Sequence, residues 1–236
     1  MKVLNEGLKK LGVLPLDERQ LDMFKKYTQI LLHYNQFMNL TRITDIDEII
    51  VEHFLDSLSI VGMPILESAQ EIMDIGTGAG FPGIPIKIYY PNKHMTLLDS
   101  QKKKVEFLDE VIDALNLKGI EAIHGRAEDI ARDIKYREKY DVVVSRAVAP
   151  LPVLLEYAIP FLKVGGCFIS YKGPNVYREV DKAQRAMEVL GAELIDVEEK
   201  EILNSDKTHM ILKIEKTTKT DSRYPRRAGK PKKSPL

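Results

Sequence analysis

A glycine-rich segment at residues 74–83, with the sequence DIGTGAGFPG, carries the strongest chemical signal in this chain. Its glycines stand at 76, 78 and 80, and glycine allows both a tight turn and the close approach of a ligand to backbone N–H groups. The segment follows a short apolar run and precedes a predicted helix at 83–89. It indicates a nucleotide-like ligand, although a strand-to-helix turn without any ligand has the same composition.

The spacing within this segment argues against two common nucleotide motifs. A dinucleotide fingerprint requires a third glycine where this chain has Phe81, followed by Pro82. A Walker loop would end in Gly-Lys-Ser or Gly-Lys-Thr, and the segment has no such ending. NAD binding and nucleoside triphosphate hydrolysis are therefore disfavoured.

An acid on the next predicted strand narrows the class of ligand. Asp99 ends the run HMTLLD at 94–99 and lies about 20 residues after Gly78. A carboxylate in this place can accept hydrogen bonds from both ribose hydroxyls of an adenosyl group. The pair predicts an adenosyl cofactor. Asp74 could accept hydrogen bonds either from the cofactor's amino-acid end or from the loop backbone, and the sequence leaves both roles open.

Short apolar runs alternate with amphipathic segments around these residues. Such alternation implies right-handed crossovers and a parallel sheet covered by helices on both faces. Only residues 204–206 separate the last two strands, so we expect a hairpin and one antiparallel edge strand. The predicted strands are 71–75, 94–99, 120–124, 141–145, 167–171, 193–201 and 208–215, and the helices between them are 83–89, 101–116, 127–134, 151–162 and 176–190.

We expect three parts along the chain. Residues 1–64 have apolar side chains at helical spacing and form an N-terminal helical extension. Residues 65–216 form the α/β domain, and residues 217–236 form a flexible basic C-terminal tail. The whole chain balances 35 Lys and Arg against 35 Asp and Glu, so the basic tail faces an acidic body. This asymmetry is typical of either a nucleic-acid-binding tail or a solubilising one.

The composition excludes several classes of protein. With 44% hydrophobic and 30% charged residues, the chain is an ordinary globular protein and not a disordered one. Cys167 is its single cysteine, which excludes an internal disulfide, and the five histidines lack metal-binding spacing. No apolar run reaches the roughly 18 residues of a membrane span, and the N-terminus has no signal-type core. We therefore expect a cytoplasmic monomer that binds no metal.

Seven runs, taken together and in order, resemble the glucose-inhibited division protein B family. Its members are S-adenosylmethionine-dependent methyltransferases that modify a guanine N7 of 16S ribosomal RNA in the small ribosomal subunit. The resemblance implies a Rossmann-like class I methyltransferase fold, with a seven-stranded, mostly parallel sheet that includes one antiparallel strand, and an N-terminal helical extension. The runs are NLTRI (39–43), VEHFLDSL (51–58), DIGTGAGFPGIPI (74–86), LLDSQKKKVEFL (97–108), GRAEDI (125–130), VVSRAVAPL (143–151) and YKGP (171–174), and the basic ending YPRRAGKPKKSPL is similar to that of Gram-positive members.

The same resemblance implies a binding site for S-adenosylmethionine. Asp99 matches the family's ribose-binding acid, Ala127 and Glu128 match the segment beside the adenine, and Arg146 matches a further cofactor-site position. Together with Asp74 from the loop analysis, the expected cofactor-binding residues are Asp74, Gly76, Gly78, Gly80, Phe81, Asp99, Ala127, Glu128 and Arg146.

Guanine N7 has a free lone pair and no proton to lose, so its methylation requires no general base. The residues after the fourth predicted strand, 145–148, lack the Asn/Asp-Pro-Pro-aromatic tetrad common in enzymes that methylate exocyclic amines. Cys167 lies mid-strand and resembles a core residue more than the nucleophile that pyrimidine C5 methylation needs. The candidates for positioning the guanine or the cofactor are Arg126, Arg146 and His53. A surface ion pair of Arg126 with Glu128 or Asp129 and a structural role for His53 stay open.

Basic residues near the predicted site are candidates for RNA binding. Lys102, Lys103 and Lys104 begin a helix beside the cofactor strand, where the family usually has a glycine and two basic residues. The remaining candidates are Lys172, at the end of the fifth strand, and Arg223, Arg226 and Arg227 in the tail. An alternative function is that of a non-catalytic, RNA-binding ribosome assembly factor on the same fold.

Overall fold

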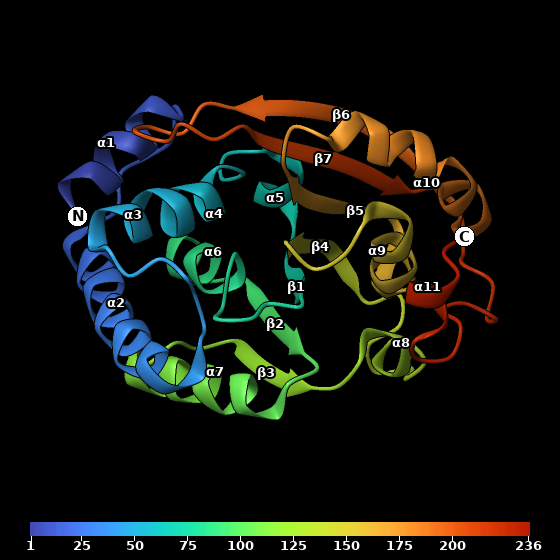
Figure 1. Cartoon of the computed structure of the whole chain (residues 1–236), viewed down its shortest axis with the longest axis horizontal. Coiled ribbons are helices and arrows are strands. Elements are labelled where there is room, and N and C mark those ends of the chain that lie inside the picture. The colour runs from blue at the N-terminus through green and yellow to red at the C-terminus, as the bar shows by residue number, and fades with distance from the viewer.

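A seven-stranded sheet forms the centre of the computed structural model, which describes residues 1–236 (Figure 1). The strands lie in the order β3-β2-β1-β4-β5-β7-β6, and β1 to β5 pair in parallel. The fold class predicted from the sequence is therefore confirmed. The strands are β1 (Glu71–Ile75), β2 (His94–Asp99), β3 (Ile120–His124), β4 (Tyr140–Arg146), β5 (Leu162–Lys172), β6 (Ala192–Lys200) and β7 (His209–Lys216).

The antiparallel strand is β7, and it does not lie at the edge. It pairs in antiparallel fashion with β5 on one side and β6 on the other, so β6 is the outermost strand. The expectation of an antiparallel edge strand was wrong in this respect. The crossover through helix α10 (Val176–Leu190) leaves a gap of one strand between β5 and β6, and the hairpin then places β7 in that gap.

Helices cover both faces of the sheet, as the alternation of elements predicted (Figure 1). Neighbouring strand residues point to opposite faces, and they belong to two hydrophobic clusters: Ile72 and Val142 to one, Met73 and Val143 to the other. The first cluster includes α6 (Gly83–Tyr89), α7 (Lys102–Ala114) and the N-terminal helices, whereas the second includes α8 (Ala127–Ile130), α9 (Leu151–Ala158) and α10. The two helices predicted at 127–134 and 151–162 end earlier, at Ile130 and Ala158.

The N-terminal helices pack directly on the sheet. They are α1 (Lys2–Lys10), α2 (Glu18–Met38), α3 (Ile46–Ile49), α4 (Asp56–Leu58) and α5 (Pro64–Ser68), with a π-helical segment at Ile50–Leu55 between α3 and α4. Asp17 caps α2 through a reciprocal capping box with Gln20. Asp45 caps α3 by accepting from the backbone N–H groups of Asp47 and Glu48. The π segment carries His53 toward the glycine loop.

The C-terminal residues 217–236 are packed against the domain, which corrects the expectation of a flexible tail. Arg226 pairs with the buried carboxylate of Glu156 at 2.6 Å, and Arg137 donates to the carbonyl oxygen of Tyr224 at 2.8 Å. The segment ends in a short helix, α11 (Lys230–Lys233), whose Pro231 is buried. The composition of the segment predicts disorder, because composition carries no information about ion pairs with acids on distant helices.

None of the helices is both long and apolar enough to cross a membrane.

Candidate functional site

The glycine loop between β1 and α6 has backbone angles that favour glycine. The φ angles of Gly76, Gly78 and Gly80 are +67°, +61° and +97°, in the left-handed region. A Cβ on Gly76 would also lie 2.5 Å from a methyl carbon of Val148. The N–H of Gly76 donates to the carbonyl oxygen of Leu98 at 2.8 Å. The loop is therefore held beside the end of β2.

Asp99 ends β2 directly beside Gly78. One carboxylate oxygen accepts from the Gly78 N–H at 3.0 Å, and the other accepts from the Gln101 N–H at 2.8 Å. A Cβ on Gly78 would have no neighbour closer than 3.9 Å, so the space above this residue is open. Each oxygen keeps a further lone pair. Asp99 can therefore accept hydrogen bonds from the hydroxyl groups of a ligand that lies over Gly78.

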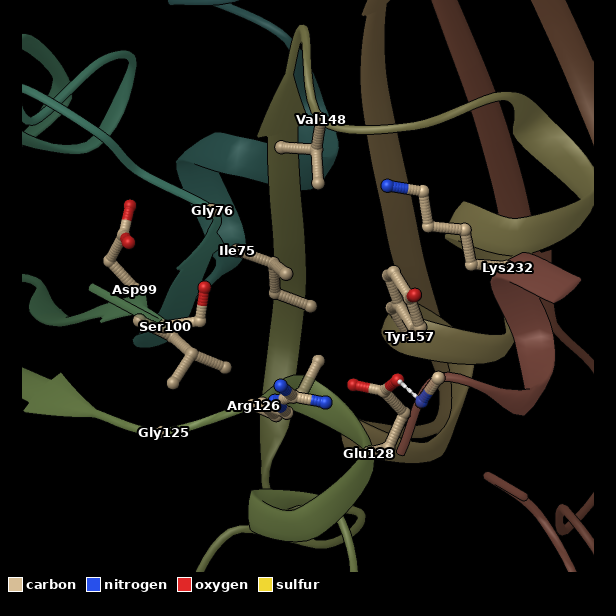
Figure 2. Close-up of a pocket in the computed structure, with 13 residues that line it drawn as sticks. Ile75, Gly76, Asp99, Ser100, Gly125, Arg126, Glu128, Val148, Tyr157 and Lys232 are labelled. Carbon is tan, nitrogen blue, oxygen red and sulfur yellow. Dashed lines mark hydrogen bonds between the residues drawn. The ribbon is translucent and has the colours of Figure 1, made fainter. Parts of the chain in front are cut away.

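Asp99 and Gly76 border a cleft of about 320 Å³ at the carboxyl ends of β1, β2 and β3, whose lining does not include Gly78 (Figure 2). Its position is where open α/β sheets bind ligands, next to the point at which the strand order reverses between β1 and β4. The lining combines apolar side chains with a few charged ones, as small-molecule sites do. The lining residues are Ile75, Gly76, Leu98, Asp99, Ser100, Gly125, Arg126, Ala127, Glu128, Val148, Tyr157, Gly229 and Lys232.

Ala127 and Glu128 line this cleft at the start of α8, in the place expected of the adenine-flanking segment. The Glu128 side chain is almost fully buried and accepts a hydrogen bond from the Gly229 N–H at 2.9 Å. Burial and the neighbouring Glu128 carboxylate raise the pKa of Tyr157 to about 12, so its hydroxyl keeps its proton at neutral pH. Arg126 is exposed at the rim and forms neither of the two ion pairs considered for it.

Asp74 lies underneath the loop and outside the cleft. It is fully buried, and one oxygen accepts from the Thr77 hydroxyl at 2.6 Å and from the Gly83 N–H at 2.9 Å. Its other oxygen has no partner. Of the two roles left open, the observed contacts are those with the loop. The structure favours the loop-supporting role, because the chain between Thr77 and Gly83 turns back over the carboxylate, and contact with the cofactor stays a prediction.

Gly80 and Phe81 also lie behind the loop. A Cβ on Gly80 would be 2.7 Å from the Tyr27 hydroxyl, which donates to the carbonyl oxygen of Ala79. Phe81 is buried between the rings of Tyr27 and His53, at centroid distances of 5.5 and 4.6 Å. Neither Gly80 nor Phe81 lines the cleft. Their contacts fix the loop on the N-terminal helices, which explains why these residue types are needed without any direct contact to the cleft.

The Arg146 side chain points away from the cleft and into an ion pair. Its guanidinium donates to Asp56 at 2.6 Å and to the carbonyl oxygen of Glu52 at 2.9 Å, and it lies 5.1 Å from the centre of the Phe81 ring. These contacts favour a structural role for Arg146, and its role in positioning the guanine or the cofactor stays a prediction. Asp56 on α4 is an acid that the sequence did not single out, and its charge satisfies the arginine. Arg146 fixes β4 to the N-terminal helices.

His53 belongs to the same buried network. Its Nε2 lies 2.7 Å from the Thr41 hydroxyl and its Nδ1 lies 3.2 Å from Arg146. Burial and the Arg146 charge lower the pKa of His53 to about 4, so the ring is neutral at pH 7. On the other side of Asp56, His209 lies 2.8 Å from the second carboxylate oxygen. These contacts favour the structural role that the sequence left open for His53.

The RNA-binding candidates divide into paired and free side chains. The Lys172 side chain is largely enclosed and pairs with Glu179 at 2.8 Å, and Arg226 pairs with Glu156, so a phosphate would have to compete with a carboxylate at either residue. Arg223 is exposed but pairs with Asp221 at 3.0 Å, and Lys102 lies 3.7 Å from Glu106 on the same helix. The RNA-binding candidates that form no ion pair are Lys103, Lys104 and Arg227, and the positioning candidate Arg126 forms none either.

Sequence reasoning missed cleft residues from distant segments, among them Val148, Tyr157, Gly229 and Lys232, and it also missed Ser100 beside Asp99. Tyr157 lies in an apolar helix and resembles a core residue in the sequence. Lys232 belongs to a basic ending that has no local signal for a defined position. Only Ser100, adjacent to Asp99, could have been inferred from its neighbour. No group of three or more His, Cys, Asp or Glu side chains is arranged to hold a metal ion.

The fold and the position of the cleft define a class I methyltransferase architecture of the S-adenosylmethionine-dependent type. A putative O-methyltransferase from Klebsiella pneumoniae has the same fold, with a TM-score of 0.60 and 13% identity over 92% of this chain and 97% of that one. The structure of M. jannaschii TYW2 in complex with AdoMet matches with a TM-score of 0.50 and 21% identity, over 64% of this chain and 73% of that one.

The chain itself belongs to the GidB family, rRNA small subunit methyltransferase G, whose model matches residues 20–210. It is 50% identical to the ribosomal RNA small subunit methyltransferase G of Acetivibrio thermocellus over 236 residues, which are 100% of this chain and 96% of the relative. The protein of the same name from Thermoanaerobacter sp. (strain X514) is 48% identical over 100% of this chain and 98% of its own length. The family predicted from the seven sequence runs is confirmed.

Proposed function

We propose that this protein transfers the methyl group of S-adenosylmethionine to N7 of a guanine in 16S ribosomal RNA, with the small ribosomal subunit as its partner. The observation that carries the proposal is the pairing of Asp99 with Gly78 at the cleft. A carboxylate with free lone pairs and an unobstructed glycine suit the ribose of an adenosyl group. Family membership supports ribosomal RNA as the substrate.

The lining of the cleft fits an adenosyl cofactor. Ile75, Leu98 and Ala127 provide apolar surface for a flat base, and Asp99 provides acceptors for the ribose hydroxyls. S-adenosylmethionine, when bound, supplies a methyl group on a sulfonium, which is ready for in-line displacement. The protein's part is to hold an acceptor in line with that methyl group. Positioning of this kind lowers a barrier by roughly 7–11 kcal/mol.

The side chains around the site suit an acceptor that has no proton to lose. Asp74 is enclosed under the loop, and the pKa of His53, lowered to about 4 by burial and the nearby Arg146, makes its ring a very weak base. Burial raises the pKa of Cys167 to about 11, so this thiol is not a nucleophile for pyrimidine C5 methylation. A ring nitrogen with a free lone pair, such as guanine N7, needs neither a base nor a nucleophilic residue.

Free positive charges around the cleft suit an RNA partner. Arg126 lines the cleft, and Lys103 and Lys104 lie at the start of α7, directly after β2; none of the three forms an ion pair. Arg126 can donate to guanine O6 or to a phosphate from the rim of the cleft. Phosphate contacts release counterions, so RNA affinity should fall with salt in proportion to the number of such contacts.

The test uses S-adenosylmethionine labelled in its methyl group and small ribosomal subunits from cells that lack this protein. Nucleosides from the treated RNA are separated and weighed by mass spectrometry. We expect label in one guanine, methylated at N7. Asp99→Ala should lose transfer and S-adenosylhomocysteine binding by more than tenfold, whereas Asp113→Ala, on the exposed end of α7, should retain both.

Label in an exocyclic amine or a pyrimidine would refute the guanine N7 assignment. If no label appears, and Asp99→Ala binds the subunit as tightly as the unchanged protein does, the chain is a non-catalytic assembly factor. Calorimetry with S-adenosylhomocysteine and with NAD separates both outcomes from an oxidoreductase.

A further inference from the structure

The C-terminal segment is anchored beside the cleft by an ion pair with a buried acid. The Arg226 guanidinium forms parallel bonds with Glu156, at 2.9 Å from Nε to Oε1 and 2.6 Å from Nη2 to Oε2, and its backbone N–H donates to the same carboxylate at 2.7 Å. Glu156 is fully buried on α9. Arg132 also donates to the carbonyl oxygen of Pro225 at 2.6 Å. Residues 225 and 226 therefore have a defined position, and the residues after them start from it.

Gly229 brings the chain from this anchor to the cleft. Its φ of +81° turns the backbone so that its N–H donates to the Glu128 carboxylate at 2.9 Å, and Figure 2 shows this bond at one side of the cleft. Pro231 is buried two residues later. Gly229 and Lys232 both line the cleft, and Figure 2 shows Lys232 on the side opposite Asp99. A segment near the end of the chain thus encloses a site whose other residues come from the sheet.

The Lys232 ammonium has no acid to neutralise it. Its side chain forms no ion pair, whereas Arg226 and Arg223 in the same segment both do. Figure 2 shows its amine directed past Tyr157 toward Val148, into the space that Gly76 and Val148 border. An unpaired ammonium in a partly enclosed cleft is a binding group for an anion.

We propose that residues 225–236 form one wall of the cofactor cleft, and that Lys232 binds an anionic oxygen group of a ligand held there. The inference rests on the proposed function and extends it, since it assigns the basic ending to the reaction site itself. Two ligands could supply the anionic oxygens: the amino-acid carboxylate of the cofactor and a phosphate of the RNA. Both are hard oxyanions that an ammonium recognises as a point charge.

The experiment compares four proteins: the full chain, Lys232→Gln, a truncation after Ala228 that keeps the Arg226 anchor, and Lys233→Gln as the matched control. Lys233 is exposed on the same short helix and does not line the cleft. Calorimetry measures the binding of S-adenosylhomocysteine and of 5′-methylthioadenosine, which lacks the carboxylate. Filter binding at several salt concentrations measures the affinity for 16S ribosomal RNA. Circular dichroism verifies the fold of each variant.

If Lys232 binds the cofactor, Lys232→Gln weakens S-adenosylhomocysteine binding about tenfold and leaves 5′-methylthioadenosine binding unchanged. If Lys232 binds RNA, the affinities for both nucleosides stay constant, and the slope of the logarithm of RNA affinity against the logarithm of salt concentration becomes shallower by about one. Either result supports a role for this ammonium. The truncation should weaken the binding of both nucleosides, because it removes the hydrogen bond from Gly229 to Glu128.

Wild-type affinities in Lys232→Gln for all three ligands would overturn the role of Lys232, and wild-type nucleoside affinity in the truncated protein would overturn the wall. These results differ from a failure of the proposed function, in which the full chain itself binds no S-adenosylhomocysteine. If the truncated chain does not fold, Lys232→Gln still decides the role of the ammonium.

Discussion

Replacing Asp74 with asparagine tests whether this acid supports the glycine loop or meets the cofactor. One of its oxygens accepts from Thr77 and Gly83, and the other is buried without a partner. The carbonyl oxygen of asparagine can accept the same two hydrogen bonds without a charge. We therefore expect Asp74→Asn to keep both the fold and the affinity for S-adenosylhomocysteine.

The magnitude follows from the protonation of this group. Burial raises the pKa of Asp74 from 3.8 to about 7. The folded state then holds a proton that the unfolded chain releases above pH 3.8, so wild-type stability falls as pH rises from about 4 to 7 and levels off above. Between pH 5 and pH 8 this amounts to about two pKa units, or on the order of 2–3 kcal/mol. Asparagine does not titrate, so the variant gains that amount relative to wild type over this range.

Urea unfolding of both proteins at pH 5 and pH 8 measures this difference, and calorimetry at pH 8 measures cofactor affinity. Asp74→Ala is the control, because it removes both hydrogen bonds and should be less stable at either pH by about 1–3 kcal/mol for each bond. If the relative stability of Asp74→Asn does not rise between pH 5 and pH 8, the buried charge is not the cause. A tenfold loss of cofactor affinity in a fully stable Asp74→Asn would place the acid in the cofactor site.

Three further predictions concern the loop and its supports. Gly78→Ala should weaken S-adenosylhomocysteine binding more than tenfold in calorimetry, yet it should lower the free energy of unfolding by only about 1–2 kcal/mol. Gly165→Ala is the control, because Gly165 also has a positive φ and open space but lies away from the cleft; this variant should lose the same stability and bind the ligand normally. Equal binding by both variants would contradict the prediction. Burial and Arg146 lower the pKa of His53 to about 4, so the free energy of unfolding of the wild type should fall, as the pH is lowered from 6.5 to 4, by up to about 3 kcal/mol more than that of His53→Gln. Urea unfolding measures both free energies as a function of pH, and parallel curves for the two proteins would disprove the shift. Lys172→Met should lower the free energy of unfolding by about 1–3 kcal/mol and leave the salt slope of RNA binding unchanged, because its ammonium pairs with a carboxylate inside the fold; a smaller slope would restore Lys172 as a phosphate contact.

The local features of this protein could be predicted from its residue types. The alternation of apolar runs and amphipathic segments located all seven strands to within a few residues, because that periodicity reflects burial on a sheet or a helix. Gly76, Gly78 and Asp99 were identified because a turn at positive φ and a carboxylate at a strand end depend on a few consecutive residues. Family membership was evident from ordered sequence runs for the same reason.

The sequence was least informative where the outcome depended on which side chains meet. Arg146 and Lys172 were assigned to ligands, yet Arg146 pairs with Asp56, which is 90 residues away in sequence. Lys172 pairs with Glu179, which is only 7 residues away in sequence but belongs to the next helix, α10. The basic ending was expected to be free, yet Glu156 and Glu128 bind it from α9 and α8. A charged residue has no sequence signal that distinguishes a buried partner from solvent.

By itself, then, the sequence determined the elements, their order, the glycine turn and the acid at the end of β2, all of which depend on neighbouring residues and backbone geometry. Only the tertiary structure decided which charges are neutralised inside the protein and which remain free at the cleft. The physical reason is that an ion pair depends on a separation of a few ångströms in space, and that separation exists only after the chain has folded.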